Sequence, residues 1–286
     1  MSTDTHLTAR TAFLEAGGIR YAYRQFGAPT GTPLLFLQHF RGGLDHWDPV
    51  ITDGLAAGRP VILFNNAGVA SSSGETPGTV DEMADHVAAF TRALGPATVD
   101  LLGFSLGGLV AQTVAVRHPE LVRRLVLVGT LARNGIEEGR PDDVFEVATR
   151  NDPPSLEDFL YLFFEPSQTS QAAGRAFWER RHRRSADVDP PTSQQTMHAQ
   201  LAAMLEFREA RGERFSELTR IVQPTLVVNG RNDIMAPTIN SYVLAQHLPN
   251  AELVVYPDSG HGAHFQFAEL FTSQVARFLD AEPAFC

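Results

Sequence analysis

Short runs of Val, Leu, Ile and Phe alternate with longer amphipathic segments along most of the 286-residue chain. Runs that are almost continuously apolar are typical of strands buried on both faces of a parallel sheet. We expect six such strands, at residues 33–38, 61–65, 99–104, 125–129, 225–229 and 253–256.

Two further strands are expected near the start of the chain, at residues 12–15 and 19–26, on either side of Gly17 and Gly18. A Gly-Gly pair suits the two-residue turn of a hairpin, so these two strands should be antiparallel. Together with the six apolar runs they predict a mostly parallel sheet of eight strands.

Segments with helical periodicity separate the strands. Helices are expected at residues 79–94, 106–118, 238–247 and 268–279. In the first of them, Val80, Met83, Val87 and Phe90 recur at the spacing that builds one apolar stripe. The alternation of strands and helices predicts an α/β fold, with helices flanking the sheet.

From residue 131 to residue 215 this alternation stops. Pro153-Pro154 and Pro190-Pro191 divide the stretch into pieces of helical length. We therefore expect a helical cap at residues 131–215, inserted into an α/β core formed by residues 1–130 and 216–286. Most of its large apolar side chains should pack the cap against the sheet, and some should line a substrate pocket. These residues are Phe159, Leu160, Tyr161, Leu162, Phe163, Phe164, Phe177, Trp178, Met197, Met204 and Leu205.

Acidic residues outnumber Lys and Arg by 33 to 23, which gives a formal net charge of −10. Such a surface repels phosphate backbones and anionic lipids, so neither a nucleic acid nor a membrane is an expected partner. The local exception is the run Arg180-Arg181-His182-Arg183-Arg184. This run could bind an anionic substrate, but we interpret it as the solvated face of a helix.

The start of the chain is polar and does not resemble a signal peptide, and no apolar stretch approaches the roughly 18 residues of a membrane helix. The sole cysteine, Cys286, can form no intrachain disulfide, which fits a reducing compartment. A cytoplasmic protein is therefore the expectation. The sequence does not predict an oligomeric state.

The candidate nucleophile is Ser105, in the sequence Gly103-Phe104-Ser105-Leu106-Gly107. A predicted strand precedes this serine and a predicted helix follows it. Glycines on both sides allow the tight turn that exposes a nucleophilic side chain. A serine hydroxyl is a weak nucleophile at neutral pH, so it needs a base, a group that orients the base, and donors for an oxyanion. The alternative is that Ser105 only caps the helix.

In this strand-turn-helix setting the chain resembles the α/β-hydrolase family, in which an acid and then a histidine follow the nucleophile along the chain. The loop at residues 230–237 resembles the acid loop of that family and nominates Asp233. The loop at residues 257–262 resembles its histidine loop and nominates His261.

Other acids and histidines are weaker candidates. Asp258 lies three residues before His261, on the same loop, and is expected to shape that loop. His264 falls where the following helix should begin. The remaining histidines should lie on the surface or in packing contacts, and they include His86, His118 and His247.

The resemblance also implies an oxyanion hole built from two backbone N–H groups, those of Leu106 and of Phe40 in the loop after the third strand. Related hydrolases often have His-Gly where this chain has His39-Phe40, so the Phe40 ring is expected to narrow the acyl side of the pocket. The loop at residues 65–74 resembles the loop after the fourth strand of the family, with Asn65 in place of an acid. We interpret it as structural support.

These residues predict a serine hydrolase that cleaves an ester or lactone bond of a fairly apolar small molecule through an acyl-enzyme on Ser105. His261 would transfer the proton and Asp233 would orient its ring. A cofactor-free perhydrolase or haloperoxidase, or a C–C bond hydrolase, could use the same three residues, and a non-catalytic ligand-binding member of the fold is a third alternative. No metal site and no cofactor are expected, because the chain has no His-Glu-x-x-His sequence, cysteine cluster or P-loop.

Overall fold

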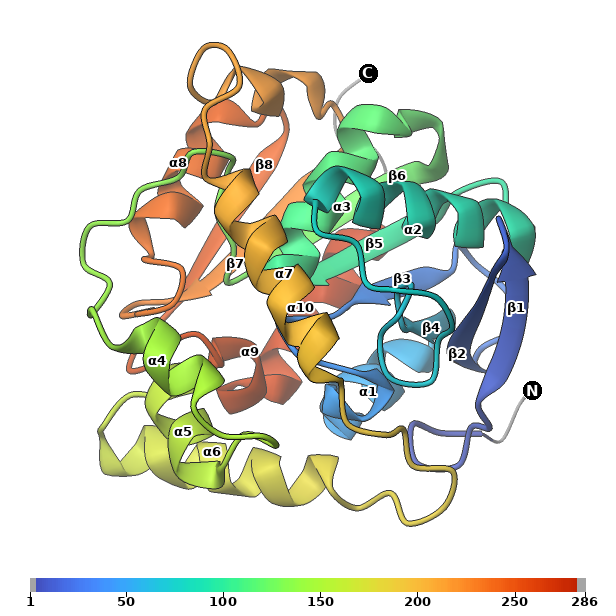
Figure 1. The fold of residues 1–286 in the computed structure, drawn as a ribbon, viewed down its shortest axis with the longest axis horizontal. Helices are drawn as coiled ribbons and strands as arrows, with labels where there is room; N and C mark the ends of the chain where they lie inside the picture. Colours follow the sequence, from blue (N-terminus) through green and yellow to red (C-terminus); the bar gives the residue numbers. More distant parts are fainter. Residues whose placement is uncertain (1–3, 282–286) are drawn as a thin grey trace.

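A computed structural model of the chain describes residues 4–281, so the sole cysteine, Cys286, lies outside the described residues. Its centre is an eight-stranded sheet with the strand order β1-β2-β4-β3-β5-β6-β7-β8 (Figure 1). The strands are β1 (Ala12–Ala16), β2 (Ile19–Gly27), β3 (Leu34–Leu37), β4 (Pro60–Phe64), β5 (Val99–Phe104), β6 (Val122–Val128), β7 (Thr225–Gly230) and β8 (Ala251–Tyr256).

Strands β1 and β2 form an antiparallel hairpin, and β2 also pairs antiparallel with β4. Gly17 and Gly18 make the hairpin turn with φ of 59° and 80°, in the left-handed region that glycine adopts without strain. All pairs from β4 through β3, β5, β6 and β7 to β8 are parallel. The predicted α/β fold with a mostly parallel eight-stranded sheet is confirmed.

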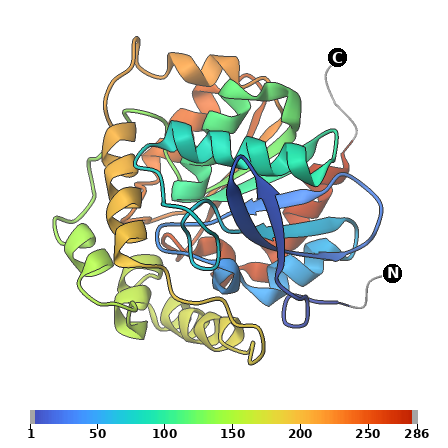
Figure 2. The ribbon, with the colours of Figure 1, turned by 45° about the vertical axis from the view of Figure 1, so that its right-hand side comes forward.

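Helices cover both faces of the sheet. Helix α2 packs beside α3 and helix α1 packs beside α10, and Figure 2 shows α2 and α1 on opposite sides of the strands. The helices of these two layers are α1 (Pro49–Ala56), α2 (Val80–Leu94), α3 (Leu106–Arg117), α8 (Ile239–His247), α9 (Ala263–Gln266) and α10 (Ala268–Asp280). The sequence does not predict α1 and α9, because 8 and 4 residues are too few to show a helical period. No helix in residues 4–281 is long and apolar enough to cross a membrane.

Alternate side chains of a central strand enter two separate cores. In β3, Leu34 and Phe36 belong to the core that includes residues of α1 and α10, whereas Leu35 and Leu37 belong to the core that includes residues of α2 and α3. All four side chains are buried. This is the burial on both faces that an almost continuously apolar strand predicts when helices cover the sheet on both sides.

Strand β8 does not follow that prediction. It lies at the edge of the sheet, and the side chains of Leu253 and Val255 are 37% and 43% exposed. Helix α8 packs against β8, but the burial pattern shows that the strand is not covered on both faces. The predicted burial of β8 was therefore wrong, because the position of a strand in the sheet decides its burial and its composition does not.

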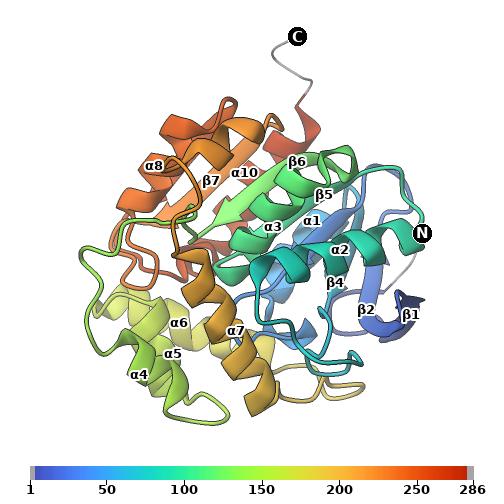
Figure 3. The ribbon, with the colours of Figure 1, turned by 45° about the horizontal axis from the view of Figure 1, so that its top comes forward.

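Four helices follow β6 and precede β7. Ser155, Ser167 and Ser193 start three of them, since each serine side chain accepts a hydrogen bond from the backbone N–H three residues later. Figures 1 and 3 agree that α4, α5 and α6 lie together at one corner of the molecule, while α7 contacts α2 and α3. The four helices are α4 (Val144–Thr149), α5 (Leu156–Phe163), α6 (Gln168–Arg181) and α7 (Gln194–Phe207).

Candidate active site

Ser105 lies in the turn between β5 and α3. Its backbone has φ 55° and ψ −117°, which is unfavourable for a residue with a side chain. The flanking glycines permit this turn. A Cβ at Gly103 would lie 2.3 Å from the carbonyl oxygen of Gly107, and a Cβ at Gly107 would lie 2.0 Å from that of Leu37. The turn therefore requires glycine at both positions, and it places Ser105 at the carboxyl end of β5.

A buried hydrogen bond joins His261 to Asp233. Nδ1 of His261 lies 2.8 Å from Oδ2 of Asp233, and the two side chains are 1% and 0% exposed. Because a carboxylate can only accept, Nδ1 carries the hydrogen, and Nε2 of the neutral ring is left as a proton acceptor. The pair therefore has the polarity that a base and its orienting acid require.

Backbone N–H groups hold the Asp233 carboxylate in place. Its Oδ1 accepts hydrogen bonds from the N–H groups of Met235, at 2.8 Å, and of Ala236, at 2.9 Å. This leaves Oδ2 for the imidazole. Since both oxygens have donors, the buried charge is compensated and the direction of the carboxylate is fixed.

Ser105 and His261 line the same cavity, which has a volume of about 540 Å³ including its open mouth. Among the described residues no hydrogen bond joins Ser105 to His261; such contacts often shorten only when substrate binds. A larger hollow of about 840 Å³ lies near Arg133 and Arg211, and none of the predicted catalytic residues lines it. Side chains of α4 and α5 supply much of the apolar wall of the Ser105 cavity, namely Val147, Ala148, Phe159, Leu162 and Phe163.

The residues predicted to form the oxyanion hole border a second cavity, of about 590 Å³, which Ser105 also lines. Phe40 lies in the loop after β3, and Leu106 is the first residue of α3. Within the part of the chain that the structure describes, neither backbone N–H donates to a protein acceptor. Leu106 has no acceptor because the first N–H groups of a helix lack intrahelical partners. Both groups are thus available as donors beside the serine.

The alternative acid and base, Asp258 and His264, do not line the Ser105 cavity. Asp258 is exposed and accepts a hydrogen bond from Oγ of Ser167 at 2.9 Å. His264 is fully buried in α9, neither ring nitrogen has a hydrogen-bond partner, and its ring packs on Phe104 with centroids 4.3 Å apart. Burial lowers the pKa of His264 well below its usual value. Within residues 4–281, no group of three or more His, Cys, Asp or Glu side chains is arranged to hold a metal ion.

Two neutral histidines to which the sequence gave no catalytic role, His39 and His46, line the Ser105 cavity. Burial lowers the pKa of His39 to about 3 and that of His46 well below its usual value. Nδ1 of His39 donates to the carbonyl oxygen of Phe40 at 2.7 Å. Nδ1 of His46 accepts the N–H of Gly43 at 2.9 Å. The two rings therefore stabilise the loop that carries Phe40 without adding charge.

The basic run at the end of α6 is not the solvated helix face that we expected. Arg180 forms an ion pair with Asp48, with 2.6 Å between Nη2 and Oδ2. Arg181 is 8% exposed and lines the Ser105 cavity. Arg184 is also buried, and of the four arginines only Arg183 is exposed. The interpretation as a solvated face was therefore wrong for most of the run.

The buried side of α6 follows a helical period. Its buried residues are Ser170, Gly174, Phe177 and Arg181. Steps of four, three and four residues place all of them on one face of a helix. Arg181 thus lies one turn after Phe177 on the buried face of α6. Phe177 is the one large apolar side chain on that face, so periodicity gives only a weak signal for it.

The fold and this site define a class of protein, the α/β-hydrolases. The family described as alpha/beta hydrolase fold matches residues 32–268, and the chain belongs to it. A solved structure of an α/β-hydrolase fold protein from Chitinophaga pinensis is similar to this chain, with 40% sequence identity and a TM-score of 0.89. That similarity covers 98% of this chain and 100% of the other.

Two further relatives have more specific descriptions. The putative carbamate hydrolase RutD of Rhizobium rhizogenes is 28% identical over 257 residues, which cover 88% of this chain and 94% of that protein. The structure of Est816, described as an N-acyl homoserine lactone degrading enzyme, is 25% identical with a TM-score of 0.70. The similarity covers 92% of this chain and 98% of the Est816 chain. The protein is therefore an enzyme, and its activity is that of a hydrolase.

Proposed function

We propose that the protein hydrolyses an ester or lactone bond of a fairly apolar small molecule through an acyl-enzyme on Ser105. The observation that carries this proposal is the buried 2.8 Å hydrogen bond between His261 and Asp233 at the cavity that Ser105 lines. A serine, a histidine and a buried carboxylate are the parts that acyl transfer to water requires. The similarity to an enzyme described as degrading an N-acyl homoserine lactone supports the proposal, since such a substrate contains a lactone, which is a cyclic ester.

In the proposed reaction, Oγ of Ser105 attacks the acyl carbonyl carbon while Nε2 of His261 takes the hydroxyl proton. Asp233 keeps the imidazole oriented and stabilises the imidazolium. The N–H groups of Phe40 and Leu106 donate to the oxyanion. The tetrahedral intermediate then breaks its C–O bond, and the leaving alcohol receives the proton from His261. A water molecule that His261 deprotonates releases the acid and restores Ser105.

We also propose that residues 131–215 act as a cap that selects the substrate, on a core formed by residues 1–130 and 216–286. The apolar side chains of α4 and α5 in the wall of the cavity support this role. Phe159 and Phe163 stack with ring centroids 4.1 Å apart, which gives the wall a fixed shape. An apolar substrate would gain about 25 cal/mol for each Å² of surface that it buries there.

The experiment that tests the function is an assay of the purified protein with p-nitrophenyl acetate and a panel of esters and lactones, together with labelling by a fluorophosphonate. We expect hydrolysis and labelling, and Ser105→Ala should lose both. Acetate with hydrogen peroxide is assayed in parallel. Peracid formation that outruns every ester, or full activity of the alanine variant, would contradict the proposal.

A further inference from the structure

Among the described residues, one cation in the Ser105 cavity has neither an acidic partner nor a hydrogen-bond acceptor. Arg181, the last residue of α6, lines this cavity together with Ser105 and His261. Within the described residues its guanidinium makes neither an ion pair nor a hydrogen bond, although the side chain is only 8% exposed. Burial lowers the pKa of Arg181 to about 9, so the group still carries its charge at neutral pH.

The other buried arginines differ from Arg181 in this respect, because each has a carboxylate or carbonyl oxygen as acceptor. Within residues 4–281 the pairs are Arg24 with Asp45, Arg41 with Asp152, Arg59 with Asp280, Arg124 with the carbonyl of Ala281, Arg133 with Glu206, and Arg184 with the carbonyl of His6. A buried, unpaired charge is costly. Oxygen acceptors among the described residues therefore compensate six buried arginines, whereas the guanidinium of Arg181 has only aromatic rings beside it.

Aromatic rings fix the position of Arg181. Its guanidinium carbon lies 4.2 Å from the ring centre of Trp178 and 5.0 Å from that of Phe159. A guanidinium over aromatic rings is attracted by the rings, and its N–H edge can still donate hydrogen bonds. That edge matches the two oxygens of a carboxylate.

The rest of the cavity offers no competing anion. No Asp or Glu is among the described residues that line it. The other arginine in the wall, Arg41, is already paired with Asp152 at 2.6 Å. In a chain whose formal net charge is −10, this cavity is therefore a local site of positive potential next to the proposed nucleophile.

We propose that Arg181 binds a carboxylate on the substrate, so that the preferred substrate is an apolar ester or lactone with a carboxylate on its chain, such as a monoester of a dicarboxylic acid. This inference rests on the proposed hydrolysis at Ser105 and names its substrate class. The carboxylate accepts two hydrogen bonds from the guanidinium, while the apolar chain lies along the wall formed by α4 and α5. Arg181 is thus a specificity-determining residue.

The test compares esters that differ only in charge. The mono-p-nitrophenyl esters of succinate, glutarate and adipate are each assayed beside the matching p-nitrophenyl methyl diester. The quantity compared is the ratio of kcat/KM for a monoester to kcat/KM for the matching neutral diester. In the wild type this ratio should be about ten or higher for at least one of the three pairs. In Arg181→Met this ratio should fall by about tenfold to a hundredfold, and Arg181→Lys should lie between the two, because lysine retains the charge but not the two-pronged edge.

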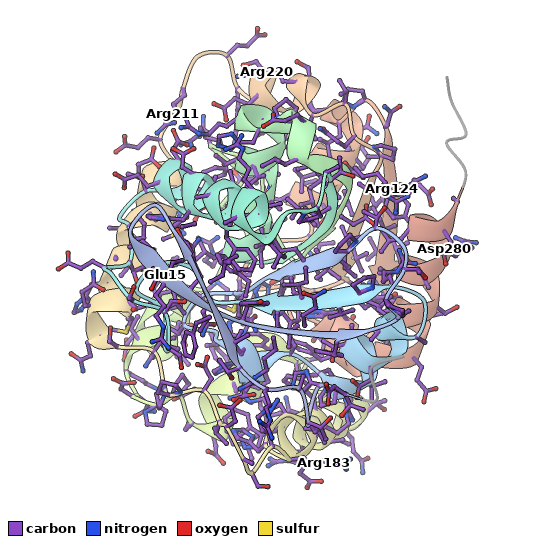
Figure 4. All side chains as sticks on the ribbon, turned by 90° about the vertical axis from the view of Figure 1, so that its right-hand side faces the viewer. Glu15, Arg124, Arg183, Arg211, Arg220 and Asp280 are labelled. Carbon is purple, nitrogen blue, oxygen red and sulfur yellow. The ribbon has the colours of Figure 1, made fainter. Side chains whose placement is uncertain are left out.

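Arg183→Met is the matched control. Arg183 is exposed two residues further along the chain, and Figure 4 shows it at the rim of the molecule, pointing outward. Its removal changes the net charge by the same amount and should leave the ratio of kcat/KM values unchanged. A wild-type ratio of one or below, or equal effects of the two substitutions on the ratio, would overturn the inference.

A binding measurement separates this inference from the proposed function. In Ser105→Ala, monomethyl adipate should raise Tm and dimethyl adipate should not, and adding Arg181→Met should abolish the shift. If this shift is seen but no ester of either charge is hydrolysed, the hydrolase proposal fails while the anion site stands. If esters are hydrolysed without charge preference and without the shift, the anion site fails alone. Should Arg181→Met not fold, the wild-type ratio and the Ser105→Ala shift decide the question.

Discussion

His261 and Asp233 are joined by a 2.8 Å hydrogen bond although 28 residues separate them in the chain. They meet because β7 and β8 are parallel neighbours, so the loops that follow both strands leave the same edge of the sheet. The loops approach closely at Gly230, where an added Cβ would lie 2.2 Å from the carbonyl oxygen of Gly260. The geometry of the pair is thus a consequence of strand order and of one glycine.

The first prediction concerns this pair. Asp233→Asn keeps the shape of the side chain but removes the charge that orients and stabilises the imidazole, so kcat for ester hydrolysis should fall about 10²- to 10⁴-fold. Steady-state kinetics with p-nitrophenyl acetate measure the loss. The matched control is Asp258→Asn, three residues from His261, which should stay within about threefold of the wild type because it removes an exposed carboxylate. The opposite ranking of the two variants would assign the acid to Asp258.

The second prediction concerns the turn at Ser105. In Gly107→Ala the new Cβ would lie 2.0 Å from the carbonyl oxygen of Leu37, and the backbone must shift to relieve the clash. The free energy of unfolding should fall by about 2 kcal/mol or more, as measured by urea denaturation. Gly58→Ala is the control, because no atom lies within 4 Å of its added Cβ. Equal stability of the two variants would mean that the turn does not need glycine.

The third prediction concerns the ion pair of Arg180 with Asp48. The side chain of Asp48 is 0% exposed, and its Oδ1 also accepts the N–H of Val50 at the start of α1. Arg180→Met leaves this buried carboxylate without its cation and should lower the free energy of unfolding by about 3 kcal/mol. Asp48→Asn retains an acceptor for the helix start. The double variant Arg180→Met/Asp48→Asn should therefore lose less free energy of unfolding than the two single variants lose together. Additive losses would argue against a coupled pair.

The fourth prediction is a loss of stability in acid. Burial lowers the pKa of His6 to about 4 and that of His39 to about 3, whereas an unfolded histidine titrates near 6.5. At a pH between the folded and the unfolded pKa, the unfolded chain binds more protons than the folded one. The contribution of each histidine to stability is therefore fully present above about pH 6.5. As the pH is lowered from there, the free energy of unfolding decreases by up to about 1.4 kcal/mol per pH unit for each histidine. Urea unfolding at about pH 7, 6 and 5 measures the slope.

Two variants identify the groups responsible for this slope. His6→Asn removes a titrating ring whose Nδ1 lies 3.0 Å from Oγ1 of Thr52, so stability should depend less steeply on pH. His198→Asn replaces an exposed ring and should leave the slope as it is in the wild type. A steeper slope for His6→Asn would reverse the sign that burial predicts.

The sequence predicts the fold well where local pattern and tertiary position agree. The central strands are apolar because helices cover both faces, and β5 begins and ends where its apolar run does. Strand β8 has the same kind of apolar run, yet lies at the sheet edge. Helix α1 is missed because its 8 residues make only about two turns, which are too few to show a helical period.

The candidate site shows the same division. Ser105, Asp233 and His261 occupy short loops with distinctive neighbours, so a sequence suffices to nominate them, and their catalytic roles stay predictions. Arg181 was hidden by the charged residues around it. Its burial depends on the aromatic rings of α5 and α6 and on the absence of a carboxylate in the surrounding wall of the described cavity. The sequence around Arg181 predicts neither the position of these rings nor the composition of the cavity wall.

The central claim is that Ser105 is the nucleophile that carries the acyl group. Its most direct test is labelling of the native enzyme with a fluorophosphonate, followed by peptide mass spectrometry to locate the adduct. We expect an adduct on Ser105, none anywhere in Ser105→Ala, and loss of ester hydrolysis in proportion to labelling. An adduct on another residue, or hydrolysis that persists after Ser105 is fully labelled, would contradict it.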